Sequence, residues 1–296
     1  MGGDILFFNK TVSDKAYAKI NLYLDVTKKR GDGFHDIKSI MQSISLFDDI
    51  EICLSESSCD TIECNIPDIP TDSSNLVIKA ADEYRKATNK KFGAHFKINK
   101  MIPSSAGMAG GSSDAAATLR ILNRLNKEPL NEREMLEIAA SVGSDVPFCY
   151  VGGTVLCEGR GELLTHLNDC PSFQIVVAIK GEGVSTPQAY RDIDNMYGDF
   201  SSSRDSGRFT HVMNGLSKND RELICMGLYN IFESVVEKER PNVTLLKEIM
   251  NKNGARCSMM SGSGPSVFGI FPDEKSAERA REELIRLGAK AYKCST

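Results

Sequence analysis

The stretch that decides the fold of this chain runs from Lys100 to Asn123 and reads KMIPSSAGMAGGSSDAAATLRILN. Just before it, Phe96 and Ile98 alternate with polar residues, which predicts a strand with one buried face. Pro103 can donate no ladder hydrogen bond, so we expect the sheet to stop there. Residues 104–113 then contain only Gly, Ala, Ser and one Met. The strand is therefore followed by a loop that is almost without side chains.

This small-residue loop opens directly into an amphipathic helix. Apolar residues recur at helical spacing from Ala115 to Leu122. A loop with so few side chains lets backbone N–H groups approach a ligand, and the positive end of the helix dipole points the same way. Ser112, Ser113 and Asp114 are expected to cap the helix. A close-packed turn would have similar residues, but the glycines and paired serines favour the polyphosphate of a nucleotide, with Ser112 or Ser113 as a candidate Mg²⁺ ligand.

The spacing of the loop is neither that of a P-loop nor that of a dinucleotide-binding turn. It resembles the second motif of the GHMP kinases, Pro-x-x-x-Gly-Leu-x-Gly-Ser-Ser-Ala, with Met108 in place of the usual Leu. The resemblance implies that the loop binds ATP. The residues that it assigns to this loop are Pro103, Ser104, Ser105, Ala106, Gly107, Met108, Ala109, Gly110, Gly111, Ser112 and Ser113.

Two residues depart from the family's pattern. Ala109 stands where Gly is frequent, so we expect a backbone conformation there that tolerates a Cβ atom. Asp114 stands where Asn is common, which predicts a negative charge near the polyphosphate.

Length and composition bound the remaining possibilities. The chain has 296 residues, enough for two domains, with 41% hydrophobic and 26% charged residues, as in soluble globular proteins. No apolar run approaches the roughly 20 residues of a membrane span, and the first residues do not resemble a secretory signal. The net charge of −4 gives no attraction for nucleic acid. Nine cysteines without a Cys-x-x-Cys pair argue against disulfides and zinc, so we expect a cytoplasmic protein.

Residues 16–26 alternate between apolar and polar side chains, which predicts a strand. Period-two geometry puts Lys19 and Asn21 side by side on its polar face, which from the residues alone is either solvated or part of a site. The run Ala-Lys-Ile-Asn-Leu resembles the first strand of the GHMP kinases that act on a cytidylyl sugar alcohol. This resemblance implies that Lys19 is catalytic and that Asn21 lies at the substrate.

Residues 28–36 read KKRGDGFHD, in which Gly-Asp-Gly signals a turn. A Phe-His pair after a turn often reflects local packing alone. The whole run resembles the cytidine-binding loop of the same branch of the family, where a ring stacks on the base and the His bonds its polar edge. Stacking of this kind is worth about 1–3 kcal/mol. The resemblance implies substrate-binding roles for Phe34 and His35, and the segment GVSTPQAY at 183–190 adds Thr186 and Tyr190.

A second amphipathic helix is expected to begin after Asn131 and to end at Gly143. Asp145 follows it in the run GSDVPF, where it could simply be a turn residue. The run resembles the segment that carries the catalytic base of the family, which implies that Asp145 accepts the proton and that Lys19 keeps it ionised. Similar correspondences place three further residues at the ATP site: Asn75 and Leu76, which open a helix near the adenine, and Lys100.

Elements in the rest of the chain follow from local pattern. We expect a hairpin over 152–162, a domain boundary within 167–172 and a buried strand over 173–179. The polar segment 198–210 is expected to be mobile, and 228–233 to start a helix in which Asn230 and Glu233 have a mainly structural role. A Gly-rich loop between two strands at 257–268 resembles the third GHMP motif, although alone it would predict only a hairpin turn. A helix over 275–287 and a strand over 290–294 close the chain.

Together these features predict an α+β protein, and the resemblance implies that it has the GHMP kinase fold. Residues 1–168 would form a domain like the second domain of ribosomal protein S5, and residues 169–296 a ferredoxin-like domain. The implied reaction is Mg²⁺-dependent transfer of phosphate from ATP to the 2-hydroxyl of cytidylyl methylerythritol, in isoprenoid precursor synthesis. We expect a small-molecule substrate, no nucleic acid or membrane partner, and a monomer or weak homodimer. The alternatives are another GHMP kinase, such as a homoserine or mevalonate kinase, and a nucleotide-binding regulator without catalysis.

Overall fold

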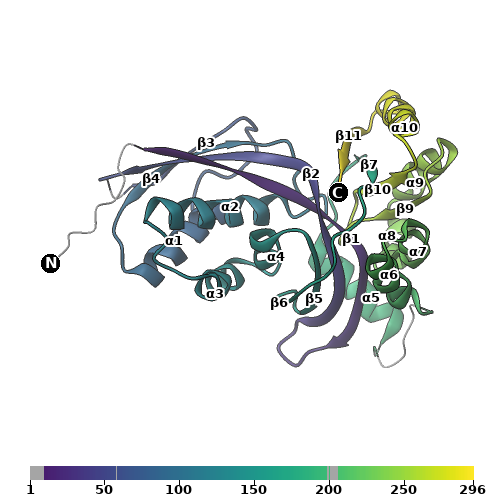
Figure 1. Ribbon diagram of the computed structural model, residues 1–296, viewed down its shortest axis with the longest axis horizontal. Helices are drawn as coiled ribbons and strands as arrows, with labels where there is room; N and C mark the ends of the chain where they lie inside the picture. Colours follow the sequence, from purple (N-terminus) through teal and green to yellow (C-terminus); the bar gives the residue numbers. More distant parts are fainter. Residues whose placement is uncertain (1–9, 58, 199, 201–205) are drawn as a thin grey trace. The chain divides into compact units, whose positions relative to one another are not determined.

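Two long strands, β1 (Thr11–Lys29) and β2 (His35–Ser55), take part in both of the compact units into which the chain folds (Figure 1). A computed structural model describes residues 10–57, 59–198, 200 and 206–296. The first unit comprises the described residues up to Ala18, with 47–103 and 109–151. The second comprises 19–46, 104–108 and the described residues from 152 onward. The units are thus interleaved along the chain, and the boundary at 168–169 stays a prediction.

In the first unit, β4 (Gly93–Asn99) pairs with the last part of β2 in antiparallel fashion and with β3 (Thr61–Cys64) in parallel fashion. The buried residues of β4 include Phe96 and Ile98, as the alternation predicted. β3 was not predicted, because its alternating pattern is only four residues long. Four helices lie on one face of these strands in Figure 1: α1 (Leu76–Thr88), α2 (Gly110–Leu125), α3 (Glu132–Val142) and α4 (Val146–Val151).

The helix α3 follows the sequence closely. Asn131 caps it by accepting a hydrogen bond from Glu134 N at 3.1 Å, and the Glu134 side chain returns one to Asn131 N at 2.8 Å. Met135 and Ala139, four residues apart on one face, are fully buried, as expected of an amphipathic helix. α4 was not predicted, because six residues that include Pro147 give no helical period.

In the second unit, the first part of β2 pairs with β5 (Thr154–Gly159), which forms a hairpin with β6 (Leu163–His166). A hairpin was predicted here, but it ends at His166 rather than at residue 162. In the same sheet, β8 (Tyr229–Asn230) pairs in parallel with β1. The segment 228–233 is therefore not the start of a helix. Tyr229 and Asn230 pair with β1 instead, and α8 (Glu233–Glu239) begins only at Glu233.

A second sheet of the same unit has the strand order β11-β7-β10-β9, with each neighbouring pair antiparallel. Its strands are β7 (Gln174–Ile179), β9 (Cys257–Met260), β10 (Val267–Phe271) and β11 (Lys290–Ser295). α9 (Pro241–Lys252) and α10 (Glu274–Arg286) pack against this sheet. The strands, the Gly-rich loop 261–266 between β9 and β10, and α10 confirm the predictions for the end of the chain.

The remaining helices of the second unit are α5 (Thr186–Tyr197), α6 (Arg208–Lys218) and α7 (Arg221–Gly227). Of the segment 198–210, residues 199 and 201–205 lie outside the described residues. The prediction of a mobile loop was wrong at its end, because α6 already begins at Arg208. None of the described helices combines the length and the apolar character that crossing a membrane requires.

Candidate active site

The polar face of β1 is buried, which excludes the solvated strand face that the sequence left open. Lys19 is 3% exposed and Asn21 is 1% exposed. The Lys19 ammonium group donates a hydrogen bond to Asn21 Oδ1 at 2.7 Å. Burying an ammonium group costs free energy unless polar groups bond it, and Asn21 Oδ1 provides such a partner here.

Asn21 joins β1 to two other segments of the second unit. Its Nδ2 donates to Ser39 Oγ at 2.8 Å, and Ser39 Oγ donates in turn to the Tyr23 carbonyl at 2.8 Å. Its Oδ1 accepts from Gly262 N at 3.0 Å as well as from Lys19. This pattern fixes the orientation of the amide and places the Lys19 ammonium beside the 261–264 loop.

The two Gly-rich loops of the sequence meet in this unit. Ser261 Oγ donates to the Gly107 carbonyl at 3.1 Å, and Lys19 N donates to the Met108 carbonyl at 3.2 Å. Gly107 has a φ of +74°, and a Cβ atom there would lie 2.2 Å from the Ser261 carbonyl oxygen. Only glycine permits this approach. Ser105 also lies close to Gly183, where a Cβ atom would be 2.9 Å from Ser105 Cβ.

The 260–262 loop is itself held by buried polar groups. Asn230 Nδ2 donates to the carbonyls of Met260 and Gly262, both at 2.8 Å. Glu233 Oε1 accepts from Met260 N at 2.8 Å and from Lys247 Nζ at 2.9 Å. Burial raises the pKa of Glu233, and Lys247 offsets only part of that rise. The structural role predicted for Asn230 and Glu233 is thus the support of this loop.

In the first unit, α2 begins three residues earlier than the sequence suggested. Its N-cap is Ala109, with φ 58° and ψ 30°, and no described side chain caps it. Ser113 Oγ donates to the Gly110 carbonyl at 2.9 Å, so the prediction that Ser112, Ser113 and Asp114 cap the helix was wrong. Gly110 and Gly111 therefore belong to the first turn of α2. The N–H groups of this turn lack intrahelical acceptors and are available to an anion.

Lys100 lies behind this first turn in a buried cluster of charges. Its Nζ donates to Asp48 Oδ2 at 2.5 Å and to Asp114 Oδ2 at 2.6 Å. The three side chains are between 0% and 6% exposed. Its predicted contact with ATP stays a prediction, but the ammonium group already has two carboxylate partners.

The two carboxylates of this cluster differ in their surroundings. Asp48 Oδ1 accepts from the N–H groups of Met101 and Ile102, at 2.5 and 2.7 Å. Asp114 Oδ1 is buried without a partner among the described residues. Burial raises the pKa of Asp114 to about 7, and Lys100 offsets part of that rise. The Asp114 carboxyl group is thus bonded to Lys100 within this cluster, and the negative charge expected near the polyphosphate stays a prediction.

Three further predicted residues lie in the first unit. Asn75 caps α1 by accepting from Val77 N at 3.0 Å, and its Nδ2 donates to the Pro70 carbonyl at 2.7 Å. Leu76 lies beside the start of α2, since a Cβ atom on Gly111 would be 3.6 Å from Leu76 Cδ1. Asp145 is half-buried immediately before α4. Its predicted pairing with Lys19 stays a prediction.

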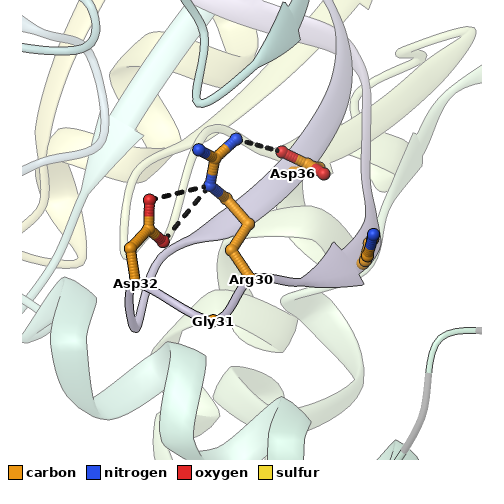
Figure 2. Close-up of a pocket in the computed structure, with 5 residues that line it drawn as sticks. Arg30, Gly31, Asp32 and Asp36 are labelled. Atoms are coloured by element: carbon orange, nitrogen blue, oxygen red, sulfur yellow. Dashed lines mark hydrogen bonds and ion pairs between the residues drawn. The ribbon is translucent and has the colours of Figure 1, made fainter.

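The Phe34 loop of the second unit is shaped by Arg30. Its guanidinium group bonds Asp32 at 3.0 Å and Asp36 at 2.8 Å, as Figure 2 shows. With Lys28 and Gly31 these residues line a pocket of about 350 Å³. Phe34 N donates to Asp32 Oδ1 at 3.1 Å, so the same clamp fixes the aromatic residue.

The ring of Phe34 stands out from this clamped loop. It is 52% exposed, and the Arg160 guanidinium group lies 5.1 Å from its centroid. An exposed aromatic face on a rigid loop can stack on a planar ligand.

Thr186, at the start of α5, is bonded to Ser263 through their hydroxyl groups at 2.7 Å.

His35 is buried among aromatic and charged groups of the same unit. Its Nε2 lies 2.7 Å from Asp194 Oδ1, and its ring stacks on Tyr190 with centroids 4.7 Å apart. Lys29 Nζ donates to the second oxygen of Asp194 at 2.6 Å. Burial favours a higher pKa for Asp194, but the hydrogen bonds from Lys29 and His35 outweigh it, so the pKa of Asp194 lies below its usual value. The structure thus brings His35 and Tyr190 together, and their substrate-binding roles stay a prediction.

Comparison with known proteins agrees with this geometry. The family described as GHMP kinases N terminal domain matches residues 75–153, and that described as GHMP kinases C terminal matches residues 212–290. A 4-diphosphocytidyl-2-C-methyl-D-erythritol kinase of Clostridium botulinum (strain Alaska E43 / Type E3) is 40% identical over 91% of this chain and 94% of its own length. The enzyme of the same name from Caldicellulosiruptor bescii is also 40% identical, over 91% of this chain and 93% of its own.

The chain belongs to the 4-diphosphocytidyl-2-C-methyl-D-erythritol kinase family.

Solved structures place this family within a wider fold. A crystal structure of 4-(cytidine 5'-diphospho)-2C-methyl-D-erythritol kinase has a TM-score of 0.77 at 28% identity and covers 96% of this chain and 98% of its own. A mevalonate kinase from L. major, covering 99% and 98%, has a TM-score of 0.78 at 15% identity. Structural likeness at such low identity shows the fold alone. The predicted GHMP kinase fold and the predicted family are both confirmed.

Several residues that shape the site escaped sequence reasoning. Asp48 and Asp194 hold Lys100 and His35 across 52 and 159 positions of the chain. No local pattern links such partners, because only the folded backbone brings them together. A weak signal existed for Asp194, which lies one helical turn after Tyr190 on the same face of α5.

Proposed function

We propose that this chain catalyses Mg²⁺-dependent transfer of the γ-phosphoryl group of ATP to the 2-hydroxyl of 4-diphosphocytidyl-2-C-methyl-D-erythritol. The observation that carries this proposal is the 40% identity to kinases of that name over 91% of the chain. The aromatic cluster around His35 adds support, since a nucleoside base needs flat faces and a polar edge contact.

Phosphoryl transfer depends on the positioning of both substrates and on neutralising charge. In the proposed mechanism the phosphates lie against the loop 104–113, whose backbone N–H groups and helix start attract anions. Asp145 accepts the proton of the substrate hydroxyl. Lys19, kept beside Asn21 inside the fold, stabilises negative charge on the transferring oxygens.

Mg²⁺ would bind with few protein ligands. The described residues contain no group of three or more His, Cys, Asp or Glu side chains that could hold a metal ion. Mg²⁺ typically keeps several waters and is held by substrate phosphates with one or two side chains, which suits this chain. Ser113 donates its hydroxyl proton to the Gly110 carbonyl, so its oxygen retains lone pairs for a cation. Ser112 or Ser113 would hold the ion, which would neutralise charge on the phosphates.

The runner-up is a GHMP kinase for another alcohol. A homoserine kinase from Cytophaga hutchinsonii has a TM-score of 0.75 at 18% identity and covers 99% of this chain and 97% of its own, a likeness of fold alone. The stacking of His35 on Tyr190, with Phe34 exposed nearby in the chain, favours the cytidylyl substrate over this alternative.

The test is an ATP-consumption assay with the purified chain, offering the cytidylyl substrate, homoserine and mevalonate separately. We expect turnover with the first alcohol and at most background with the others. Asp145→Asn should reduce turnover with that substrate by about 10²-fold or more without unfolding the chain. Asp68→Asn, an exposed carboxylate in the same unit, is the matched control. Turnover with homoserine or mevalonate alone, or equal turnover by the Asp145 variant, would contradict the proposal.

A further inference from the structure

The imidazole ring of His35 is held at one of its two nitrogens. Nε2 is bonded to Asp194 Oδ1 at 2.7 Å. Across the residues that the structure describes, nothing bonds Nδ1. The side chain is 6% exposed, so its ring cannot turn freely to exchange the two nitrogens.

Asp194 can only accept in this contact. Lys29 Nζ donates to its Oδ2 at 2.6 Å, while its Oδ1 faces the His35 ring. The ion pair with Lys29 keeps the carboxyl group ionised, and a carboxylate is acceptor-only. The proton of a neutral His35 therefore resides on Nε2, because the opposite tautomer would set two acceptors against each other at 2.7 Å.

This assignment determines what Nδ1 can do. In a neutral imidazole whose Nε2 carries the proton, Nδ1 has a lone pair and acts as an acceptor. The group that it binds must then be a donor. The rings of Tyr190 and Phe200 lie against His35, with centroids 4.7 and 5.8 Å away, so the surroundings suit a flat ligand.

Cytosine and uracil differ at this point of chemistry. The 4-position of cytosine carries an amino group, a donor, whereas pyrimidines of the uracil and thymine kind carry a carbonyl acceptor there. An acceptor nitrogen such as Nδ1 accepts a hydrogen bond from the 4-amino group of cytosine. It can form no hydrogen bond with the 4-carbonyl group of uracil, because both atoms are acceptors. A polar site rejects the wrong partner because its own buried group is left unpaired.

We propose that Asp194 is a positioning residue that selects a cytosine base over a uracil base by holding His35 as its Nε2–H tautomer. The inference rests on the proposed function, in which a cytidylyl group is bound beside His35. It goes further by naming the residue that determines base specificity and the atom through which it acts.

The first experiment reads the tautomer directly. The chain has four histidines, so ¹⁵N-labelled histidine gives a simple spectrum, in which His35→Gln identifies the signal of interest. At pH 8.5 we expect the His35 Nδ1 resonance at the shift of an unprotonated nitrogen and the Nε2 resonance at that of a protonated one. A proton on Nδ1, in either the other tautomer or the imidazolium form, would overturn the proposal.

The second experiment measures base preference by calorimetry, without catalysis. The ligands are the cytidylyl substrate and its synthetic uridylyl analogue. We expect the unaltered chain to prefer the cytidylyl ligand at least about tenfold, and Asp194→Asn to lose most of that preference. Asp192→Asn, the same change two residues away where the side chain bonds Gln188 instead, should retain it.

The possible outcomes distinguish a failure of this inference from a failure of the proposed function. If the unaltered chain binds the cytidylyl ligand but Asp194→Asn keeps the full preference, the role of Asp194 is refuted and the proposed function stands. If the unaltered chain binds neither ligand, the proposed function fails and the inference with it. Because the tautomer is read in the unaltered chain, a variant that does not fold leaves the proposal open to refutation by the first experiment.

Discussion

Replacing Asp114 with Asn should make the free energy of unfolding fall less as the pH rises from 5 to 8. Asp114 is buried against Lys100 and has an oxygen without a described partner, and burial raises its pKa from 3.8 to about 7. A carboxyl group whose pKa is higher in the folded chain stabilises the fold below its unfolded pKa near 4. It loses that contribution as the pH rises through 7. An amide cannot titrate, so Asp114→Asn escapes this loss.

The size of the effect follows from the pKa difference. The rise from 3.8 to about 7 is about three units, and each unit corresponds to about 1.36 kcal/mol. The full contribution is thus about 4 kcal/mol, of which about 2–3 kcal/mol should be lost between pH 5 and pH 8. Relative to the unaltered chain, Asp114→Asn should gain that amount over the same interval.

Urea unfolding at pH 5, 6, 7 and 8 measures this directly, as the difference in free energy of unfolding between variant and unaltered chain. Asp68→Asn, which changes an exposed carboxylate of the same unit outside the cluster, is the matched control and should show no such relative gain. A difference for Asp114→Asn that stays constant from pH 5 to pH 8 would refute the reasoning, since Asp114 would then be ionised throughout.

Three other substitutions test the remaining structural arguments by urea unfolding. Lys100→Met leaves two buried carboxylates without a cation and should cost about 3–5 kcal/mol at pH 8, and less at pH 5; a loss under 1 kcal/mol would contradict the cluster. Ala109→Gly relieves a left-handed backbone and should stabilise by up to about 1 kcal/mol, whereas Ala117→Gly inside α2 should destabilise; equal effects would exclude strain at 109. Asn230→Ala removes two hydrogen bonds to the 260–262 loop and should cost about 1–3 kcal/mol with a large fall in kcat. Unchanged kcat would show that the loop does not need this support.

Sequence reasoning succeeded where local pattern and physical cause coincide. The alternation in β1 placed Lys19 and Asn21 on one face, and the cap at Asn131 set the start of α3 within a residue. The predicted strand over 173–179 and helix over 275–287 are likewise present as β7 and α10. Each of these features depends on residues a few positions apart.

The missed features have causes that lie elsewhere in the chain. β8 is a strand because β1 offers a parallel partner, and a two-residue strand has no period of its own. α2 begins at Gly110 because Ala109 takes a left-handed conformation, which composition does not predict for alanine. Asp114 looked like a helix cap in the sequence, but a distant Lys–Asp pair captures its carboxyl group. Long-range partners decide these positions.

The central claim is that this chain phosphorylates one hydroxyl group of a cytidylyl sugar alcohol. The most direct measurement is ³¹P and ¹³C NMR of the product formed from 4-diphosphocytidyl-2-C-methyl-D-erythritol with ATP and Mg²⁺. We expect a new phosphomonoester signal coupled to the carbon that bears the 2-hydroxyl, with the diphosphate signals of the substrate retained. Unchanged substrate, or a phosphate on a different oxygen, would contradict the account.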